Sequence, residues 1–422
     1  MHKNHGSKWS LGYALLVSGT AYADPSIDQW LQGLHVSGNI RAYSFSRDYT
    51  GTATNTAPDL RSSSLGGKIK VETANQDGIG GALGMYFAQD VGLNNHAQNN
   101  KYINPLLMGT NYGIYTLGEA YLQYRKADFL TRIGNQRIDN PWINPSDGFM
   151  IPNLYRAGVV SFIPVDNLQI EGERILRFEN RTASGFANSN LFALPYDNPH
   201  YTGSNNGSGA LGMTYKGDSA NAKTWLYRFN DFAKMAYLQG GYKLQRAGVS
   251  PFVDFQYMRE TSDGAQLLGA VDSKAYGAKM GAFLPDKLGS AYFAYNRVPV
   301  NPVAGVSNGN MLSPYTQVYN TDPLYTTVMN YGLVSARGAG NAWKIGTNIK
   351  SLGEKLDTEL TYSKYNTSPY VANVDAYMLD IAYHLEGAFK GVTLRDRLGI
   401  EHGIPNWGGA YVDNRVMLQY DF

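Results

Sequence analysis

The chain ends in the stretch NRVMLQYDF, Asn414–Phe422, in which apolar and polar side chains alternate. One face carries Val416, Leu418, Tyr420 and Phe422, and the other carries Arg415, Met417, Gln419 and Asp421. Alternation with a period of two places these sets on opposite sides of an extended backbone, which predicts a β-strand.

The same alternation recurs upstream in segments of about ten residues. The clearest segments are Leu65–Thr73, Leu168–Phe178, Ala376–Glu386 and Gly391–His402. In the second of these, Leu176 and Phe178 are predicted to share the apolar face. Arg174 and Asp396 interrupt the pattern, because each falls on the apolar face of its segment. Helical periodicity is scarce and long apolar runs are missing, so we expect an all-β chain without membrane-spanning helices.

A soluble antiparallel sandwich would show the same alternation. Three features favour a transmembrane antiparallel β-barrel instead. The apolar faces are rich in Tyr, Phe and Trp near strand ends, as in the aromatic girdles of membrane barrels. The connections alternate between short and long. The terminal Phe422 after an alternating strand resembles the closing strand that outer-membrane proteins present to their assembly machinery, so that machinery is an expected partner.

The predicted connections fall into two classes. Short polar turns, such as Asn75–Gly78 and Gly387–Gly391, alternate with long stretches, such as Ile138–Arg156, Asn180–Gly207 and Val298–Gly340. Short turns are expected on the periplasmic side and long loops outside. Counting strands between these markers gives 18, with 16 as the alternative. A barrel of that size encloses an aqueous lumen.

The first 23 residues have the form of a secretory signal peptide. A basic start with Lys3 and Lys8 precedes a short apolar run, and Ala21-Tyr22-Ala23 has the small-x-small pattern of a cleavage site. The run is about half of the roughly 20 apolar residues that span a bilayer. Residues 1–23 are therefore predicted to be removed, which leaves residues 24–422 as a single barrel domain.

The composition excludes several other classes of protein. Lys and Arg number 36 and Asp and Glu 34, a net charge of +2 that argues against nucleic acid as the main partner. The chain has no cysteine, which excludes disulfides, thiolate metal sites and a cysteine nucleophile. Its histidines lie in no nucleophile motif, so we do not expect an enzyme. We also expect no cofactor and no metal.

Function should reside in the polar residues that face the lumen. The last two predicted strands are adjacent and place Arg395, Arg397 and Arg415 on the inward side, and Lys350 is a further inward base. A row of arginines stabilises an anionic solute by charge and by bidentate bonding to a carboxylate. These four residues are therefore assigned to a basic ladder for the substrate. The alternative is that charges in a wet lumen are merely solvated.

The stretch from Arg132 to Gly158 begins as a strand and then changes character. It reads RIGNQRIDNPWINPSDGFMIPNLYRAG, and its three prolines and the Asp147-Gly148 pair are incompatible with a continuous ladder strand. Its apolar content, with Trp142 and Phe149 among others, is too high for a loop in water. We expect an inward fold that packs on the wall and narrows the lumen. An external loop packed on its neighbours is the alternative.

This stretch resembles the OprD-type substrate-specific porins of Gram-negative outer membranes. The resemblance is carried by two sets of motifs: Gly134-x-Gln136, Asn140-Pro141, Pro145-x-Asp147-Gly148-x-Met150-x-Pro152 and Gly158, and then Leu394-Arg395-x-Arg397 and Asn414-Arg415. It implies an 18-stranded, usually monomeric barrel whose third extracellular loop folds inside. It also implies an arginine row opposite an acidic or electronegative pocket, along which carboxylates such as amino acids or aromatic acids pass.

By residue, the resemblance assigns the row to Arg395, Arg397 and Arg415. It assigns the constriction to Asn144, Ser146, Asp147, Phe149, Tyr155 and Arg156. Many members carry an arginine where this chain has Phe149. A less basic constriction, better suited to an aromatic or hydrophobic acid, is therefore expected.

The predicted function is passive, substrate-selective uptake of small solutes across the Gram-negative outer membrane. The alternative is a non-specific diffusion porin, a trimer of 16-stranded barrels. A plugged receptor is disfavoured because the predicted barrel begins near Leu34. The expected partners are small solutes, outer-membrane lipid and lipopolysaccharide. A monomer is expected, with a trimer as the alternative.

Overall fold

The computed structural model of the chain describes residues 33–49, 59–94, 96, 103–109, 111–193, 206–246, 248–304, 307–317, 319–335, 338–369, 372–404 and 409–422. The predicted signal peptide, residues 1–23, lies outside these residues. Within the described ranges, no helix is both long enough and apolar enough to cross a membrane.

A single sheet of 18 antiparallel strands forms the molecule. The strands are β1 (His35–Tyr49), β2 (Leu60–Glu72), β3 (Ile79–Gln89), β4 (Gly113–Lys126), β5 (Phe129–Gln136), β6 (Leu154–Val165), β7 (Leu168–Glu179), β8 (Ser208–Lys216), β9 (Ala220–Phe229), β10 (Ala233–Lys243), β11 (Ser250–Ser262), β12 (Asp272–Phe283), β13 (Gly289–Val298), β14 (Gly340–Ser351), β15 (Leu356–Asn366), β16 (Asn373–His384), β17 (Val392–Ile404) and β18 (Gly409–Asp421). Short 3₁₀ helices occupy some connections: η1 (Leu191–Ala193), η2 (Pro285–Lys287), η3 (Ser307–Gly309) and η4 (Gly387–Phe389). The predicted all-β barrel of 18 strands is confirmed, and the count of 16 is wrong.

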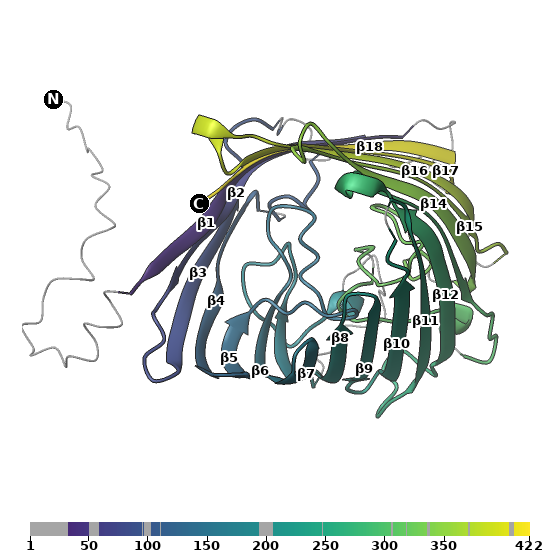
Figure 1. Cartoon of the computed structure of the whole chain (residues 1–422), viewed down its shortest axis with the longest axis horizontal. Helices are drawn as coiled ribbons and strands as arrows, with labels where there is room; N and C mark the ends of the chain where they lie inside the picture. Colours follow the sequence, from purple (N-terminus) through teal and green to yellow (C-terminus); the bar gives the residue numbers. More distant parts are fainter. Residues whose placement is uncertain are drawn as a thin grey trace, which may run out of the picture.

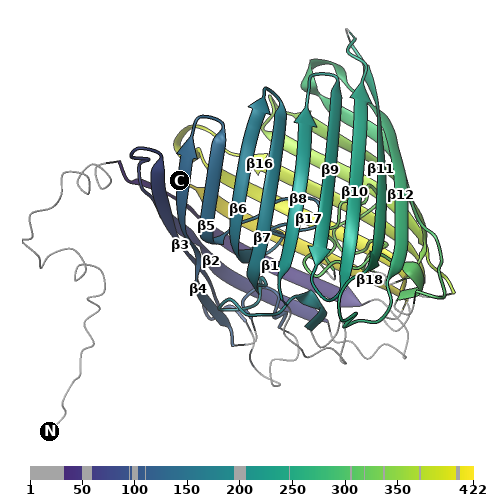
Figure 2. The same cartoon turned by 90° about the horizontal axis from the view of Figure 1, so that it is seen from below.

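The sheet closes on itself through the first and last strands. The β1–β18 ladder runs from Asn39 opposite Asp421 to Tyr49 opposite Tyr411. Beyond it, the backbone of Phe422 exchanges two hydrogen bonds with Gly38, of 3.0 and 3.1 Å. Figure 1 looks along the resulting barrel, and Figure 2 shows the inclined strands from the side. Closure pairs the backbone polar groups that lipid could not satisfy.

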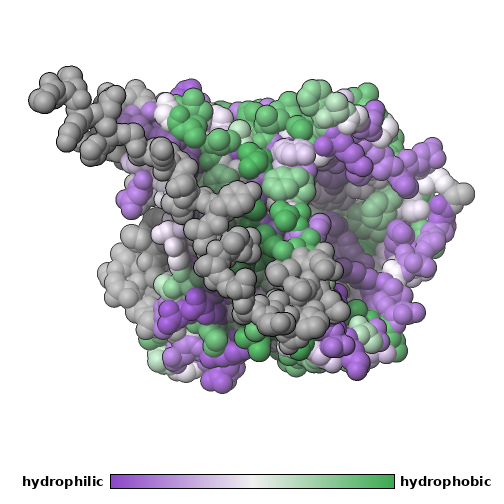
Figure 3. Space-filling view, turned by 90° about the vertical axis from the view of Figure 1, so that its left-hand side faces the viewer, coloured by the Kyte–Doolittle hydropathy of each residue, from purple (hydrophilic) through white to green (hydrophobic). Residues whose placement is uncertain are grey.

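Side chains alternate between the lumen and the outer wall along each strand. In β9 and β10, Trp225 and Tyr237 are buried on the inner side, whereas Leu226 and Leu238 are exposed on the outer side. Exposed large apolar side chains of this kind occur in strands from β1 to β18, as expected where lipid covers the wall. In the coloured part of Figure 3, hydrophobic side chains form a band from top to bottom, and hydrophilic ones surround a hollow on its right and lie along its lower edge.

A bulge in the β6–β7 pair changes the side on which two predicted residues lie. The register shifts between Arg156 and Ala157, so that these residues face Arg177 and Ile175. Leu176 is therefore 51% exposed on the outer wall, while Phe178 is only 2% exposed and faces inward. The predicted common face of Leu176 and Phe178 is wrong, because the extra residue of a bulge inverts the alternation beyond it.

Two segments between strands fill part of the barrel. One lies between β5 and β6, around Trp142, and the other lies between β13 and β14, around Tyr315. Ser313 Oγ donates to the carbonyl of Trp142 at 3.3 Å, and Tyr315 OH lies 2.9 Å from Ser208 Oγ of β8. Figure 1 shows both segments inside the ring of strands. The β13–β14 connection, expected as an external loop, thus has apolar side chains such as Tyr315, Leu324 and Leu333 buried inside the barrel, whereas Val303 near its start is 85% exposed.

Aromatic rings hold these inner segments together. Tyr155 and Phe178 of the wall lie 5.5 and 5.2 Å from the ring centre of Tyr315. Lys344 of β14 adds a polar tie, because its Nζ donates to the carbonyl of Thr327 at 3.0 Å. The hydrophobic core of this barrel therefore lies inside the lumen rather than between two layers of secondary structure.

An acidic residue, Asp322, is buried in the β13–β14 segment. Its Oδ1 accepts hydrogen bonds from Thr327 Oγ1 at 2.7 Å and from the Leu324 N–H at 3.2 Å. Its Oδ2 is buried without a hydrogen-bond partner among the described residues. Burial raises the pKa of Asp322 from 3.8 to about 6, and these hydrogen bonds offset only part of that effect.

The lipid-facing wall predicts the outcome of one substitution. Leu360 lies near the middle of β15 and is exposed on the outer side. Leu360→Arg should destabilise the folded barrel by about 2–4 kcal/mol, because the charge would enter the hydrocarbon layer. Urea unfolding in lipid vesicles measures this. The matched control is Asn348→Arg, on the exposed inner side of β14, which should cost far less; equal losses would contradict the assigned faces.

The raised pKa of Asp322 predicts a pH dependence for the inner segment. A folded-state pKa above the unfolded value means that the folded segment loses stability as pH rises from about 4 to about 6. Asp322→Asn should remove this dependence and stabilise the segment at pH 7 by roughly 1–3 kcal/mol. Hydrogen exchange of the backbone amides of residues 319–335 checks both effects. An unchanged pH profile in the variant would show that another group titrates.

Candidate functional site: an arginine-lined cavity

A cavity of about 410 Å³ lies between the wall and the two inner segments. Its basic lining residues are Arg47, Arg181, Arg395, Arg397 and Arg415, and its acidic ones are Glu359 and Asp380. Further lining residues are Ser146, Gly148 and Phe149 of the first inner segment, residues 319–321 and 327–330 of the second, and Leu106, Met378 and Tyr411. We call this space the arginine cavity.

The last strands bring the predicted ladder arginines together. Arg397 of β17 is directly opposite Arg415 of β18 in the register, and Arg395 follows two residues along β17 on the same inward side. Each arginine is inward because it alternates with lipid-facing neighbours such as Leu394 and Val416. The sequence placed all three on one surface, and the structure has all three in one cavity lining.

Acidic residues engage this arginine row closely. Asp380 of β16 accepts hydrogen bonds of 2.7 and 2.5 Å from Arg395, and its carboxylate lies 3.0 Å from Arg397 Nε. Arg415 is only 6% exposed and donates to Asp413 at 2.7 Å. Arg415 is therefore mostly fixed in the wall, whereas Arg395 and Arg397 carry the accessible part of the row.

Lys350, the fourth predicted ladder residue, lies apart from Arg397 and Arg415. It sits at the end of β14 beside a short turn and forms an ion pair of 3.0 Å with Asp357. It lines a second cavity of about 790 Å³, which shares Arg395 and Asp380 with the arginine cavity. Lys350 thus belongs to the predicted periplasmic mouth rather than to the row itself.

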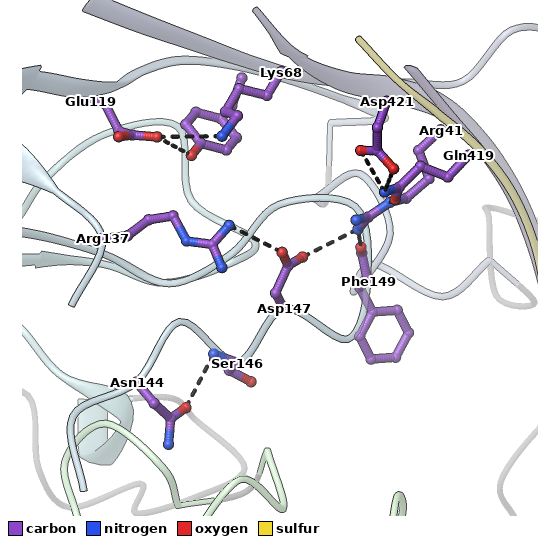
Figure 4. A network of polar contacts seen from close by, with 11 residues as sticks. Arg41, Lys68, Glu119, Arg137, Asn144, Ser146, Asp147, Phe149, Gln419 and Asp421 are labelled. Atoms are coloured by element: carbon purple, nitrogen blue, oxygen red, sulfur yellow. Dashed lines mark hydrogen bonds and ion pairs between the residues drawn. The ribbon is translucent and has the colours of Figure 1, made fainter. Parts of the chain in front are cut away.

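Ion pairs anchor the first inner segment to the wall. Asp147 lies 3.2 Å from Arg41 of β1 and 3.2 Å from Arg137, as Figure 4 shows. Burial lowers the pKa of Arg137, but the charge and hydrogen bond of Asp147 together with Tyr86 and Glu119 outweigh burial, and the pKa is raised. Arg41 also donates to the carbonyl of Phe149, and Tyr43 OH donates to that of Gly148 at 3.0 Å. Since Arg41 faces the lumen, these contacts hold the Asp147 turn inside the barrel.

Asn144 and Ser146 shape the same turn. Asn144 Oδ1 accepts the Ser146 N–H at 3.1 Å, and Asn144 Nδ2 donates to the carbonyl of Thr321 at 2.7 Å. The first bond stabilises the turn, and the second links the two inner segments. Ser146 and Thr321 line both the arginine cavity and a third cavity of about 710 Å³, so they stand at the junction of the two.

Two residues predicted for the constriction lie elsewhere. Tyr155 is fully buried behind the turn and donates to the carbonyl of Asn144 at 2.7 Å, so it positions the segment without lining a cavity. Arg156 projects outward, because its neighbours Tyr155 and Ala157 both point inward. Its Nε donates to Asn135 at 2.8 Å. The constriction assignment of Arg156 is wrong, since the inner segment ends before β6 begins.

Phe149 does not make the cavity apolar. Its ring is 2% exposed and stacks on Tyr43 at 5.8 Å. The guanidinium groups of Arg181 and Arg415 lie 4.4 and 4.6 Å from its centre. The resemblance led us to expect a less basic constriction, because Phe149 stands where many members have an arginine. Arg181, from the β7–β8 connection, supplies a positive charge beside that position. No local pattern around Arg181 indicates this contribution.

The β13–β14 segment supplies residues that the sequence analysis missed. Asn330 accepts a hydrogen bond from Arg415, and Tyr319 lies under the guanidinium of Arg181 at 3.6 Å. A usable signal was present. The run of Tyr315, Leu324 and Leu333 is too apolar for an external loop, which is the criterion that identified the first segment. Metal-binding clusters of His, Cys, Asp and Glu are not found in the part of the chain that the structure describes.

Comparison with known structures reveals the same fold in solved porins. Pseudomonas aeruginosa OccK9 (OpdG) matches with a TM-score of 0.78 at 15% identity, over 93% of this chain and 99% of that one. P. aeruginosa OpdK with vanillate matches with a TM-score of 0.77 at 15% identity over the same shares. A BenF-like porin from Pseudomonas fluorescens Pf-5 matches with a TM-score of 0.79 at 13% identity over 93% and 99%. No curated protein matches the sequence.

A family model supplies the assignment that such low identities cannot. The model of the outer membrane porins of the OprD family matches residues 28–301, which is more than half of the chain. Its members are channels rather than enzymes, and the closed 18-stranded barrel agrees with this description. The chain therefore belongs to the OprD family of porins in the Gram-negative outer membrane.

Proposed function

We propose that this substrate-specific channel passes small carboxylate-bearing solutes through the arginine cavity, passively and without an energy source. The observation that carries the proposal is the charge of the lining. Five arginines face two acids of the lining, Glu359 and Asp380, and Asp413 behind the lining pairs with Arg47 and Arg415, so the difference is 5 − 3 = +2. A narrow, partly dehydrated passage with this excess attracts anions more strongly than neutral solutes of the same size.

Arg397 is the best candidate for direct contact with a carboxylate. Its Nε lies 3.0 Å from an Asp380 carboxylate oxygen, but the N–H does not point at that oxygen. The Arg397 side chain therefore makes an ion pair and no hydrogen bond with a described residue. Its two terminal nitrogens can therefore bind both oxygens of a carboxylate. The guanidinium of Arg395 can replace its bonds to Asp380 by bonds to a solute carboxylate, because both side chains line the second cavity as well as the arginine cavity. Several weak binding sites one after another along the passage suit a channel, since a single site that bound the solute tightly would stop its flow.

Aromatic acids fit the proposal best. Tyr319, Tyr411 and the edge of Phe149 contribute to the same lining as the arginines. These rings are only 1–5% exposed, so a planar solute ring meets their edges while its carboxylate meets Arg397. The solved OpdK structure, which shares this fold, is described as containing vanillate, an aromatic carboxylate. We propose this class of solute for the present chain as well.

We further propose that the protein works as a monomer and that Phe422 is the residue read by the barrel assembly machinery. Phe422 extends the closing strand, stands on the outer wall and packs against Tyr420 at 6.0 Å. A non-specific trimeric porin is less well supported, because the inner segments narrow this lumen and leave the arginine cavity between themselves and the wall.

The role of Arg397 is open to a direct test. Arg397→Ala should lower uptake of benzoate-like acids at least roughly tenfold, the cost of losing one charge-assisted bond of about 1.5–3 kcal/mol. Uptake of neutral sugars of similar size should be spared. Swelling of proteoliposomes in isotonic solute measures both. The control is Arg132→Gln, a lumen-facing arginine outside the arginine cavity, which should behave as wild type. Equal loss for acids and sugars would refute the ladder.

Single-channel recording in a planar bilayer tests the monomer. The purified protein should give small, single conductance steps that aromatic acids block in a concentration-dependent way. Large steps in groups of three without such block would show a trimeric diffusion porin.

A further inference from the structure

Basic residues gather on the outer wall at one end of the barrel, away from the lumen. They lie near the ends of β6 to β13 at which the long β7–β8 and β13–β14 connections and the short β9–β10 connection (residues 230–232) are found. The end with the long connections is the extracellular end in such barrels. The residues are Arg156, Arg174, Arg177, Arg228, Lys234, Arg259, Lys274 and Arg297. The recorded acids within ion-pair distance of them, among the described residues, are Asp263 and Asp272.

Alternation along the strands shows that these side chains point toward the membrane. Arg228 shares the outer side of β9 with Leu226, between the buried Tyr227 and Phe229. Arg297 follows Phe293 on the outer side of β13 in the same way. The basic residues therefore stand directly above the apolar band, at the level of the lipid headgroups.

The strands on the opposite side of the barrel show no such excess of bases over acids among the described residues of their outer faces. There, on the outer sides of β15 and β16, Lys364 pairs with Asp375 at 3.2 Å. Arg61 of β2 pairs with Asp48 of β1. On strands β6 to β13, by contrast, Asp263 forms ion pairs with both Arg228 and Lys234. Arg177, Lys274 and Arg297 form no ion pair with a described residue. The excess of positive charge is thus confined to one side.

A groove of about 590 Å³ lies in the part of the outer wall that carries these basic residues, between β6 and β13. Arg228, Lys234 and Arg259 stand at its upper edge. Leu211 and Leu226 line it toward the membrane centre, and the small residues Gly209 and Ala236 leave it hollow. Arg228 and Lys234 are directly opposite in the β9–β10 register and are 63% and 58% exposed. One acid, the buried Glu173, also belongs to the lining, and Asp272 pairs with Arg259. Arg228 and Lys234 share the single carboxylate of Asp263, so the upper part of the groove between them is cationic, and the lower part is apolar.

We propose that this groove binds a phosphorylated glycolipid of the outer leaflet, the lipid A part of lipopolysaccharide. A phosphate would lie between Arg228 and Lys234, with Arg259 at its side, and an acyl chain would run down over Leu226 and Leu211. Arginine and lysine are the usual partners of phosphate oxygens. Asp263, whose side chain is buried, holds both cations in place but neutralises only one of them. The remaining basic residues extend the surface to neighbouring lipids.

Binding of diphosphoryl lipid A to the purified full-length protein in detergent tests the proposal, with native mass spectrometry as the readout. The triple variant R228Q/K234Q/R259Q should bind at least roughly 30-fold more weakly, since each base near an anionic lipid surface contributes about fivefold. The matched control R61Q/K364Q removes two cations from the opposite side of the barrel and should bind as wild type. Heat-modifiable migration in gels verifies that both variants are folded.

Two further measurements use the unchanged protein and do not depend on the variants. Dephosphorylated lipid A should bind far more weakly than the diphosphoryl form, and millimolar inorganic phosphate should not displace the lipid. Equal binding of the dephosphorylated form, or equal weakening in the triple variant and the control, would overturn the proposal. Complete displacement by inorganic phosphate would also overturn it, because the surface would then hold free anions rather than lipid.

Discussion

The ladder between β1 and β18 is the constraint on which the rest of the structure depends. A bilayer offers no partner to a free backbone N–H or carbonyl, so a sheet in lipid must close. The pairing from Asn39–Asp421 to Tyr49–Tyr411 and the exchange between Gly38 and Phe422 achieve this closure. Once the ring is closed, each strand has one side in lipid and one in the lumen. Alternation of side chains is then imposed on all strands together.

Closure also explains where the hydrophobic core is found. An 18-stranded ring is too wide to be filled by its own side chains. The chain fills part of it with the segments around Trp142 and Tyr315, which pack on each other and on Phe178 of the wall. The channel is what these segments leave open. Its walls are therefore rigid on the strand side and depend on buried polar contacts, such as those of Asp147 and Asp322, on the segment side.

Charge is distributed differently on the two sides of the wall. Inside, the arginines of β17 and β18 are restrained by Asp380 and Asp413, so that a solute meets a positive surface without a single tight site. Outside, the bases of β9 to β13 face lipid headgroups and share few acids. One alternating strand pattern thus presents basic residues both to the lumen, where we propose that an anionic solute passes, and to the outer wall, where we propose that a phosphorylated lipid binds.

The sequence by itself determined the class of fold and the inward side of Arg395, Arg397 and Arg415, because alternation is a local property of each strand. It favoured 18 strands over 16, and the closed sheet decided between them. The proline-rich stretch around Asp147 was identified for the same reason: its composition suits neither a ladder strand nor water. Tertiary structure alone decided which residues meet across the lumen. Arg181 and Asn330 join the arginine cavity from distant connections, and a bulge places Leu176 and Phe178 on opposite sides of β7. Arg156 lies on the outer wall, because alternation in β6 places Tyr155 and Ala157 inside. Such contacts depend on how separate segments pack in a closed ring, and the period of one strand carries no information about that packing.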